Sequence, residues 1–224
     1  MNKFNKFFFF GILLSAVAAH AAPVPDPVSK LDFYEGGGST GVDNVLLNDS
    51  DQADGYVVNG RIGNKDTGLL VNFAGNGTEV LSTPSGGQAR IEAVDGSFDY
   101  IKIYMDDSAF AFGKIIFNID AIDEGNVDGE VTLRGANQFG DIYQETFALS
   151  WNGENWLTGE AFDGRFFTYV EIISTIGMTA MSDLQQVRIG AVPNENPVPE
   201  PATMLLFGSG IIGLAALARR KNNV

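Results

Sequence analysis

The chain contains no cysteine and a single histidine, His20. Without cysteine it forms no disulfide and offers no thiolate for catalysis or metal binding. His20 lies inside an N-terminal segment that has the pattern of a cleaved export signal, so we expect the exported part to contain neither residue. Ser-His-Asp and Cys-His catalysis are thereby excluded, as are zinc and copper sites built from imidazole or thiolate.

Basic residues are also scarce, with 14 Lys and Arg against 28 Asp and Glu in 224 residues. Five of them, at positions 3, 6 and 219–221, lie in the two terminal segments, which leaves 9 for the exported part. A chain this acidic is a poor ligand for nucleic acid or anionic lipid, because both require cationic contacts. This acidic composition is typical of a soluble surface protein that is in contact with divalent cations.

The first 22 residues have the three parts of a secretory signal peptide. Lys3 and Lys6 supply the positive charge, residues 7–18 form an apolar core, and Ala19, His20 and Ala21 form a small-x-small cleavage site. The apolar core is short for a membrane span and is followed directly by the cleavage residues. We therefore predict cleavage and export rather than an N-terminal anchor.

A second tripartite pattern occupies residues 198–224. Its parts are a proline-rich motif, an uncharged apolar run and a basic cluster: Val198, Pro199, Glu200 and Pro201; residues 202–218; and Arg219, Arg220 and Lys221. As a helix, the apolar run would be about 25 Å long, slightly less than the hydrocarbon core of a bilayer. Snorkelling or local thinning makes up the difference, and the basic cluster should stay cytoplasmic. The pattern predicts one C-terminal transmembrane helix.

This arrangement resembles the PEP-CTERM sorting signal of exported proteins from Gram-negative bacteria, which generally make exopolysaccharide. The resemblance implies that an exosortase, a membrane-embedded cysteine transpeptidase, recognises Pro199, Glu200 and Pro201 and processes the chain there. An inner-membrane intermediate would then pass to the cell surface or the extracellular matrix. The alternative is a plain tail anchor behind a proline-rich linker, in which case the residues after Glu200 stay attached.

Between the two signals we predict one domain, residues 23–192, and a linker at residues 193–197. Apolar residues alternate with a period of 2, as Ile101, Ile103 and Met105 do. Gly, Asn and Asp separate these runs, which is typical of an all-β protein. Strands are predicted at residues 69–73, 91–94, 100–105, 114–120, 130–134, 147–151, 166–173 and 187–191. We expect an antiparallel two-sheet β-sandwich of jelly-roll kind.

Parts of this domain are similar to a sandwich domain that recurs in PEP-CTERM proteins. The similar stretches are residues 83–91 with 95–98, and residues 183–190 near the end of the domain. This resemblance implies a fold and a setting, and it implies no activity.

Two acidic loops carry the oxygen ligands that Ca²⁺ prefers. Neither loop has a glutamate at the closing position, so we interpret both as solvated acidic turns and keep Ca²⁺ binding as the alternative. The candidate ligands are Asp49, Asp51 and Asp54 in the first loop and Glu124, Asn126 and Asp128 in the second.

Exposed aromatic rings are the other candidate site, because a ring face matches the apolar C–H face of a sugar. Trp156 and Tyr143 are the main candidates, and Tyr34 is a third. Trp151 follows Phe147 and Leu149 at alternate positions, so we expect it in the core.

Without histidine or cysteine, an enzyme would depend on two nearby carboxylates, one with a raised pKa. No pair stands out in the sequence, and we expect no enzymatic activity. We expect an exported protein with a structural or adhesive role in an exopolysaccharide or biofilm matrix. The rival is a carbohydrate-binding module or a carboxylate-based glycan hydrolase on the same sandwich. An exposed aromatic platform, or a groove with two close carboxylates, would favour this rival.

Overall fold

The computed structural model describes residues 25–47, 53–84, 90–122, 129–151, 153–174 and 181–194. The predicted signal peptide, the motif at residues 199–201 and the apolar run at residues 202–218 lie outside these ranges. In the part of the chain that is described, no helix is long and apolar enough to cross a membrane. The transmembrane helix therefore stays a prediction from the sequence.

The described residues form thirteen strands, and every strand pairing among them is antiparallel. The all-β antiparallel prediction is confirmed. The strands are β1 (Leu31–Glu35), β2 (Asp43–Leu46), β3 (Val57–Ile62), β4 (Leu70–Ala74), β5 (Leu81–Ser82), β6 (Arg90–Ala93), β7 (Tyr100–Met105), β8 (Phe110–Ala121), β9 (Gly129–Asn137), β10 (Ile142–Leu149), β11 (Asn155–Ala161), β12 (Phe167–Ser174) and β13 (Met181–Pro193).

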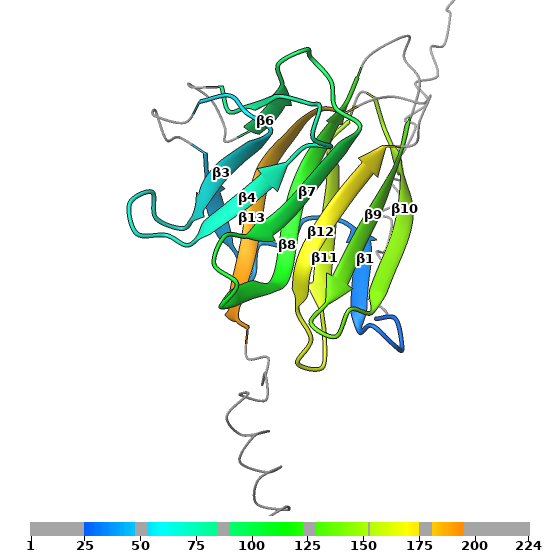
Figure 1. The fold of residues 1–224 in the computed structure, drawn as a ribbon. Coiled ribbons are helices and arrows are strands. Elements are labelled where there is room, and N and C mark those ends of the chain that lie inside the picture. The colour runs from blue at the N-terminus through cyan, green and yellow to red at the C-terminus, as the bar shows by residue number, and fades with distance from the viewer. Residues whose placement is uncertain are drawn as a thin grey trace, which may run out of the picture.

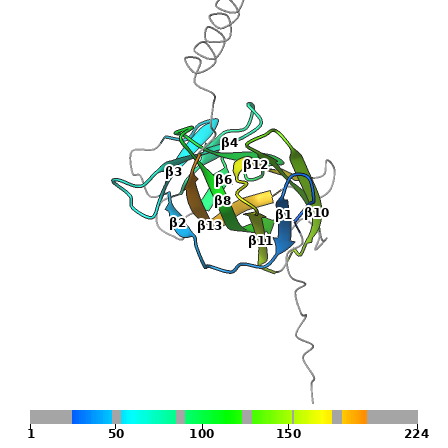
Figure 2. The same ribbon diagram turned by 90° about the horizontal axis from the view of Figure 1, so that it is seen from below.

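Hydrogen bonds join these strands into one network, which is folded into two facing layers (Figures 1 and 2). The front layer has the order β10-β9-β12-β7-β4-β3. The back layer has the order β1-β11-β8-β13, with β2 and β6 on the far side of β13. Because β2 pairs with both β3 and β13, it connects the layers along one side. Two layers agree with the expected sandwich, and the jelly-roll subclass stays a prediction.

Apolar side chains fill the space between the layers. Ile101, Ile103 and Met105, which the sequence placed on one face, are buried there in β7. Burial of apolar surface is the main favourable contribution to folding, and the largest of the fully buried side chains here are phenylalanines. The fully buried phenylalanines are Phe33, Phe73, Phe98, Phe112, Phe117 and Phe167.

Most predicted strands lie where the alternation placed them, to within a few residues. The exceptions are informative: β8, β10 and β13 begin four to six residues earlier than expected, at Phe110, Ile142 and Met181, and β10 ends at Leu149. Trp151 therefore lies beyond the strand on which we had placed it, and it is half-buried in the following turn rather than in the core. The strands that were not predicted are β1, β2, β3, β5 and β11.

Residues 36–42 form a glycine-rich strap that runs from β1, at one edge of the back layer, to β2 near the other edge (Figure 2). The strap lies against the outer surface of this layer. The hydroxyl of Thr158 in β11 donates a hydrogen bond to the carbonyl of Gly36 (2.5 Å). Gly37 packs against the indole of Trp156, and a Cβ built on this glycine would lie 2.9 Å from Cε3 of the ring.

The strap covers the outer face of the back layer, so that residues on this face are buried. Ile116 lies between the core residues Ile115 and Phe117 and so points away from the core, yet it is fully buried. Asn118, two residues further along the same face, is also buried. The equivalent face of the front layer is crossed by no such segment among the residues the structure describes (Figure 2).

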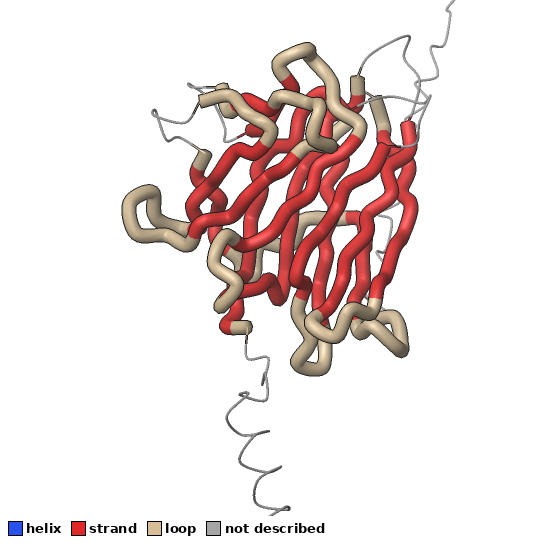
Figure 3. The backbone as a smooth tube through the Cα atoms, in the orientation of Figure 1, coloured by secondary structure: helices blue, strands red, loops and turns tan. Residues whose placement is uncertain are grey.

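Loops gather at the two ends of the sandwich (Figure 3). The chain leaves β13 at what we call the exit end, which also holds residues 26–30, 106–109, 138–141 and 162–166. Asn194 is fixed at this end: its backbone N–H donates to the carbonyl of Ala109 (2.7 Å) and its side-chain amide to the carbonyl of Ser108 (2.8 Å). Any segment that follows residue 194 starts from the exit end.

Gly190→Ala should destabilise the protein by disturbing the contact between β13 and the strap. A Cβ at residue 190 would lie 2.5 Å from the carbonyl oxygen of Gly41, so one of the two backbones must move. We expect the free energy of unfolding to fall by about 1–3 kcal/mol, as measured by urea denaturation. Gly38→Ala is the matched control, because a Cβ there meets no atom within 4 Å. Equal losses in the two variants would contradict a strap packed on β13.

Candidate functional site

A row of polar side chains crosses the outer face of the front layer. Lys102 of β7 lies opposite Glu171 of β12, Glu171 lies opposite Arg134 of β9, and Arg134 lies opposite Gln144 of β10. Side chains alternate between the two faces of a strand, and Ile103, the neighbour of Lys102, is in the core. The row therefore lies on the face that is turned away from the core.

Glu171 is the centre of this row and is only 4% exposed, although it lies on the outer face. One carboxylate oxygen accepts a hydrogen bond from Nε of Arg134 (2.6 Å) and lies 2.5 Å from Nη2 of the same guanidinium. The other accepts a hydrogen bond from the hydroxyl of Tyr100 (2.9 Å) and lies 3.8 Å from Nζ of Lys102. A buried carboxylate is costly unless it is paired and hydrogen-bonded, and Glu171 is both.

Tyrosines flank the row on both sides. Tyr100 lies on one side, and Tyr104 and Tyr169 lie on the other, all half-buried. Nζ of Lys102 lies 4.1 Å from the centroid of the Tyr169 ring, within the range of a cation–π interaction. We call this group the tyrosine face; it consists of Tyr100, Lys102, Tyr104, Arg134, Tyr169 and Glu171.

The hydrogen bonds that Glu171 accepts keep Arg134 and Tyr100 in their protonated forms. The hydrogen bond to Glu171 raises the pKa of Arg134, so the guanidinium stays charged. Burial, followed by the hydrogen bond to Glu171, raises the pKa of Tyr100, and its hydroxyl remains a donor. The face thus presents two cations, one anion and three phenol rings in a set arrangement.

The aromatic residues singled out from the sequence lie elsewhere. Tyr143 packs against the core, with its ring stacked on Phe33 at a centroid distance of 5.9 Å. Trp156 lies beside the strap on the back layer; its indole N–H donates to Glu154 (2.8 Å), and the guanidinium of Arg188 is 5.2 Å from its ring centroid. The structure does not bring Tyr143 and Trp156 together, and their stacking on a sugar stays a prediction.

Tyr34, the third aromatic candidate, lies on β1 and is engaged within the protein. Its hydroxyl donates a hydrogen bond to Glu160 (2.7 Å), which also pairs with Lys114 (3.2 Å). This cluster is on the back layer, away from the tyrosine face.

Two cavities adjoin Glu154 at the end of the sandwich opposite the exit end. The first, of about 460 Å³, is lined by residues that include Glu35, Leu149 and Trp156. The second, of about 330 Å³, is lined by residues that include Asp120 and Trp151. Small-molecule sites are commonly concave and combine apolar walls with a few polar groups, so the first cavity is the better candidate for a small ligand.

Asp120, which lines the second cavity, is one of a pair of carboxylates. Asp120 of β8 and Asp183 of β13 are opposite each other, and Nε2 of Gln185 donates to both, at 2.7 and 2.9 Å. The pKa of Asp183 is raised to about 6, chiefly by burial and also by the charge of Asp120, while the hydrogen bond from Gln185 acts in the opposite direction. Burial also raises the pKa of Asp120 itself.

Among the Ca²⁺ candidates, only Asp54 is in the described part of the chain. Within that part, no group of three or more Asp, Glu, His or Cys residues is arranged to hold a metal ion. The other candidate ligands, Asp49, Asp51, Glu124, Asn126 and Asp128, lie outside the described residues. Ca²⁺ binding by the two acidic loops stays a prediction.

Residues 197–221 match the family described as the PEP-CTERM protein-sorting motif. The chain carries a PEP-CTERM sorting signal. The matched range contains the proline-rich motif, the apolar run and the basic cluster described above. The resemblance to a PEP-CTERM sorting signal is therefore confirmed. A PEP-CTERM signal implies export, processing by an exosortase and sorting to the cell surface.

No curated protein matches the chain. Among solved structures, the domain resembles two family 29 carbohydrate binding modules, both with a TM-score of 0.31. One is a mutant of CBM29-2 (12% identity, covering 70% of this chain and 90% of that one), and the other is CBM29_1 from Piromyces equi (10%, covering 72% and 90%). A third is the apo form of BiXyn10A CBM1 (12% identity, TM-score 0.23, covering 69% and 95%). TM-scores this low carry no argument about a ligand.

Asp183→Asn should make the stability of the protein less dependent on pH. The pKa of Asp183 is about 6 when folded and 3.8 in the ordinary state, so the folded protein holds the extra proton. The free energy of unfolding therefore falls as pH rises through the interval between these two values. Asparagine keeps the oxygen that accepts the Gln185 bond and removes this titration.

We expect the variant to be more stable than the wild type by up to about 3 kcal/mol above about pH 7, and the two to converge near pH 4. Urea denaturation at a series of pH values measures both curves. Curves that run parallel across this interval would show that Asp183 does not titrate as described.

Proposed function

We propose that this protein is a component of a bacterial exopolysaccharide or biofilm matrix, with a structural or adhesive role and no catalytic activity. The observation that carries the proposal is the PEP-CTERM motif at residues 197–221, because it directs the chain to the surface where such a matrix lies. The proposed route starts with removal of the signal peptide near residue 22. It continues through an inner-membrane intermediate in a Gram-negative cell and ends with processing by an exosortase at residues 199–201.

The tyrosine face is the surface that we propose for contact with polysaccharide. Tyrosine rings complement the apolar C–H faces of sugars, and the charged row offers donors and acceptors to hydroxyl groups. Glu171 already holds Arg134, Lys102 and Tyr100 in place, which lowers the entropic cost of ordering them around a ligand. The open front layer, on a sandwich that we take to be of jelly-roll type, leaves this face accessible to a long polymer.

A carboxylate-based glycan hydrolase is the second candidate, and one observation favours it. Asp120 and Asp183 form a pair with raised pKa values beside a cavity that Trp151 and Glu154 line. We prefer the non-catalytic role because Asp183 is 7% exposed and is bound to Gln185, which leaves it little access to a substrate. Release of reducing ends from the host polysaccharide, lost in Asp120→Asn, would reverse this preference.

Glu200→Ala should stop the processing of the chain. The variant should accumulate in the inner membrane at full length, whereas the wild type should yield a species that ends near residues 198–201 outside that membrane. Intact mass spectrometry of cell fractions from the native host distinguishes the two. Glu195→Ala is the matched control, because it removes an acidic residue just outside the matched range. Normal release of the Glu200 variant would mean that the motif is not read by a sorting enzyme.

Replacing Tyr104 and Tyr169 together by alanine should weaken binding to the host exopolysaccharide several-fold, because two ring platforms are lost from one face. Retention on the purified insoluble polysaccharide measures binding, and circular dichroism checks the fold. Tyr56→Ala is the control, since Tyr56 is an exposed tyrosine outside the tyrosine face. If both variants are retained like the wild type, the tyrosine face is not the binding surface.

A further inference from the structure

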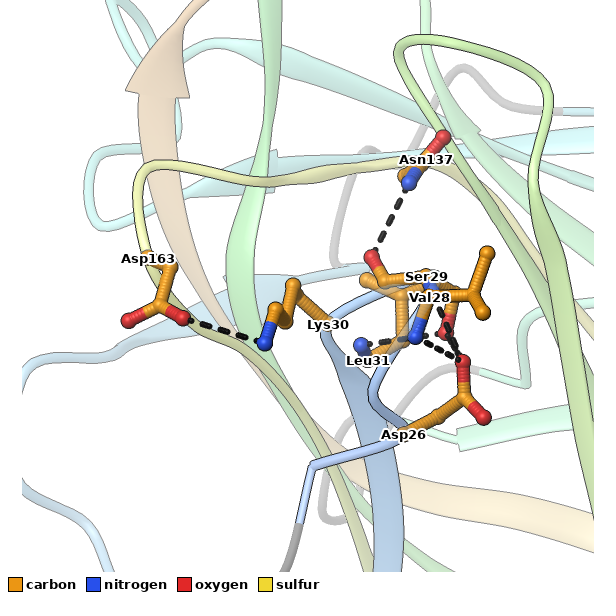
Figure 4. Close-up of polar contacts among 7 residues, drawn as sticks. All are labelled: Asp26, Val28, Ser29, Lys30, Leu31, Asn137 and Asp163. Carbon is orange, nitrogen blue, oxygen red and sulfur yellow. Dashed lines mark hydrogen bonds and ion pairs between the residues drawn. The ribbon is translucent and has the colours of Figure 1, made fainter.

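Three segments at the exit end are tied to one another (Figure 4). The side-chain amide of Asn137 donates a hydrogen bond to the carbonyl of Ser29 (2.9 Å), which joins the end of β9 to the turn before β1. Asp26 holds that turn by accepting hydrogen bonds from the backbone N–H (2.6 Å) and the hydroxyl (2.8 Å) of Ser29. Lys30 pairs with Asp163 (3.6 Å), which joins the turn to the β11–β12 loop. These contacts connect the turn before β1 to the end of β9 and to the β11–β12 loop.

Large apolar side chains are exposed at the exit end and at the adjoining start of β10. Val28 is 68% exposed, Phe139 is 62% exposed and Ile142 is 58% exposed. The guanidinium of Arg165 lies 4.2 Å from the centroid of the Phe139 ring and holds the ring in place. Val28 lies in the turn before β1, Phe139 in the turn between β9 and β10, and Ile142 is the first residue of β10. Exposed apolar side chains on neighbouring segments indicate an interaction site more strongly than isolated ones do. We call Val28, Phe139 and Ile142 the apolar tip.

We propose that the apolar tip rests on the lipid bilayer while the chain is still anchored by its C-terminal segment. Asn194 is at the same end of the molecule, and seven residues, 195–201, separate it from the apolar run at residues 202–218. Seven extended residues span at most about 25 Å, so the exit end is kept close to the bilayer surface. The inference rests on the anchored intermediate of the proposed route, and it does not depend on glycan binding.

The chemistry of the apolar tip fits the bilayer interface. Phenylalanine and branched aliphatic side chains gain free energy when they leave water for the region below the headgroups. A tether of this length keeps the effective concentration of the surface high, so a weak contact suffices. The contact is apolar and needs no anionic lipid, which agrees with the excess of acidic residues in the chain.

The test uses the anchored intermediate, which lacks residues 1–22 and keeps its C-terminal segment, in vesicles of zwitterionic phosphatidylcholine. Because the chain has no cysteine, Ile142→Cys provides a single site for an environment-sensitive fluorophore. Val94→Cys is the matched control, an exposed apolar residue at the opposite end of the sandwich. We expect iodide in the aqueous phase to quench the probe at residue 142 several-fold less than the probe at residue 94. A quencher attached to the lipid should act on the probe at residue 142 alone.

A further variant shows whether the apolar tip causes the contact. Val28→Ser with Phe139→Ser, added to the labelled Ile142→Cys chain, should restore quenching by iodide. Equal quenching at residues 142 and 94 in chains that float with the vesicles would overturn this inference alone. Protection from iodide without quenching from the lipid would also overturn it, because a second protein copy would then cover the tip. A chain that does not float would overturn both this inference and the anchored intermediate.

Discussion

The pairing of β13 with β8 is the interaction on which the rest of the structure depends. The two strands are paired from Met181 to Pro193, while the other edge of β13 pairs with β6 and then with β2. The register shifts between Gln185 and Arg188, and Gln186 has a φ of 51°, as in a bulge that bends a strand. Through β2 the same strand is connected to the front layer, and its last residues decide where the chain leaves the domain.

The two outer faces of the sandwich differ in whether another segment of the chain covers them, among the residues that the structure describes. On the back layer, the strap covers the sheet and buries Ile116 and Thr158. On the front layer, the sheet stays open and a carboxylate is nevertheless buried, because Arg134, Lys102 and Tyr100 surround it. Two of the 14 Lys and Arg residues of this acidic chain pair with that one glutamate. Because these side chains are gathered around Glu171 on an uncovered face, the front layer is the better candidate for binding a ligand.

Local patterns explain what could be predicted from the sequence. The sorting motif was recognised because its three parts follow one another in the chain, and β7 was predicted in full because Ile101, Ile103 and Met105 alternate without interruption. The residues of β7 that belong to the tyrosine face alternate with these three. The face itself could not be predicted from the sequence, because the order of β7, β12 and β9 depends on pairings between residues far apart in the chain. β11 was missed because Leu157 is the one large apolar residue that it places in the core cluster.

The position of residue 194 also determines how the domain responds to force. A pull on this residue along the strand direction loads the long ladder between β13 and β8 in shear, so that many backbone hydrogen bonds resist together instead of opening one after another. β2 holds the free edge of the same strand against the same pull. Opening of the sandwich under load is governed by its rate of unfolding. Load applied to the tail of the chain therefore reaches both layers through β13, which pairs with β8 in the back layer and with β2, the strand that also pairs with β3 in the front layer.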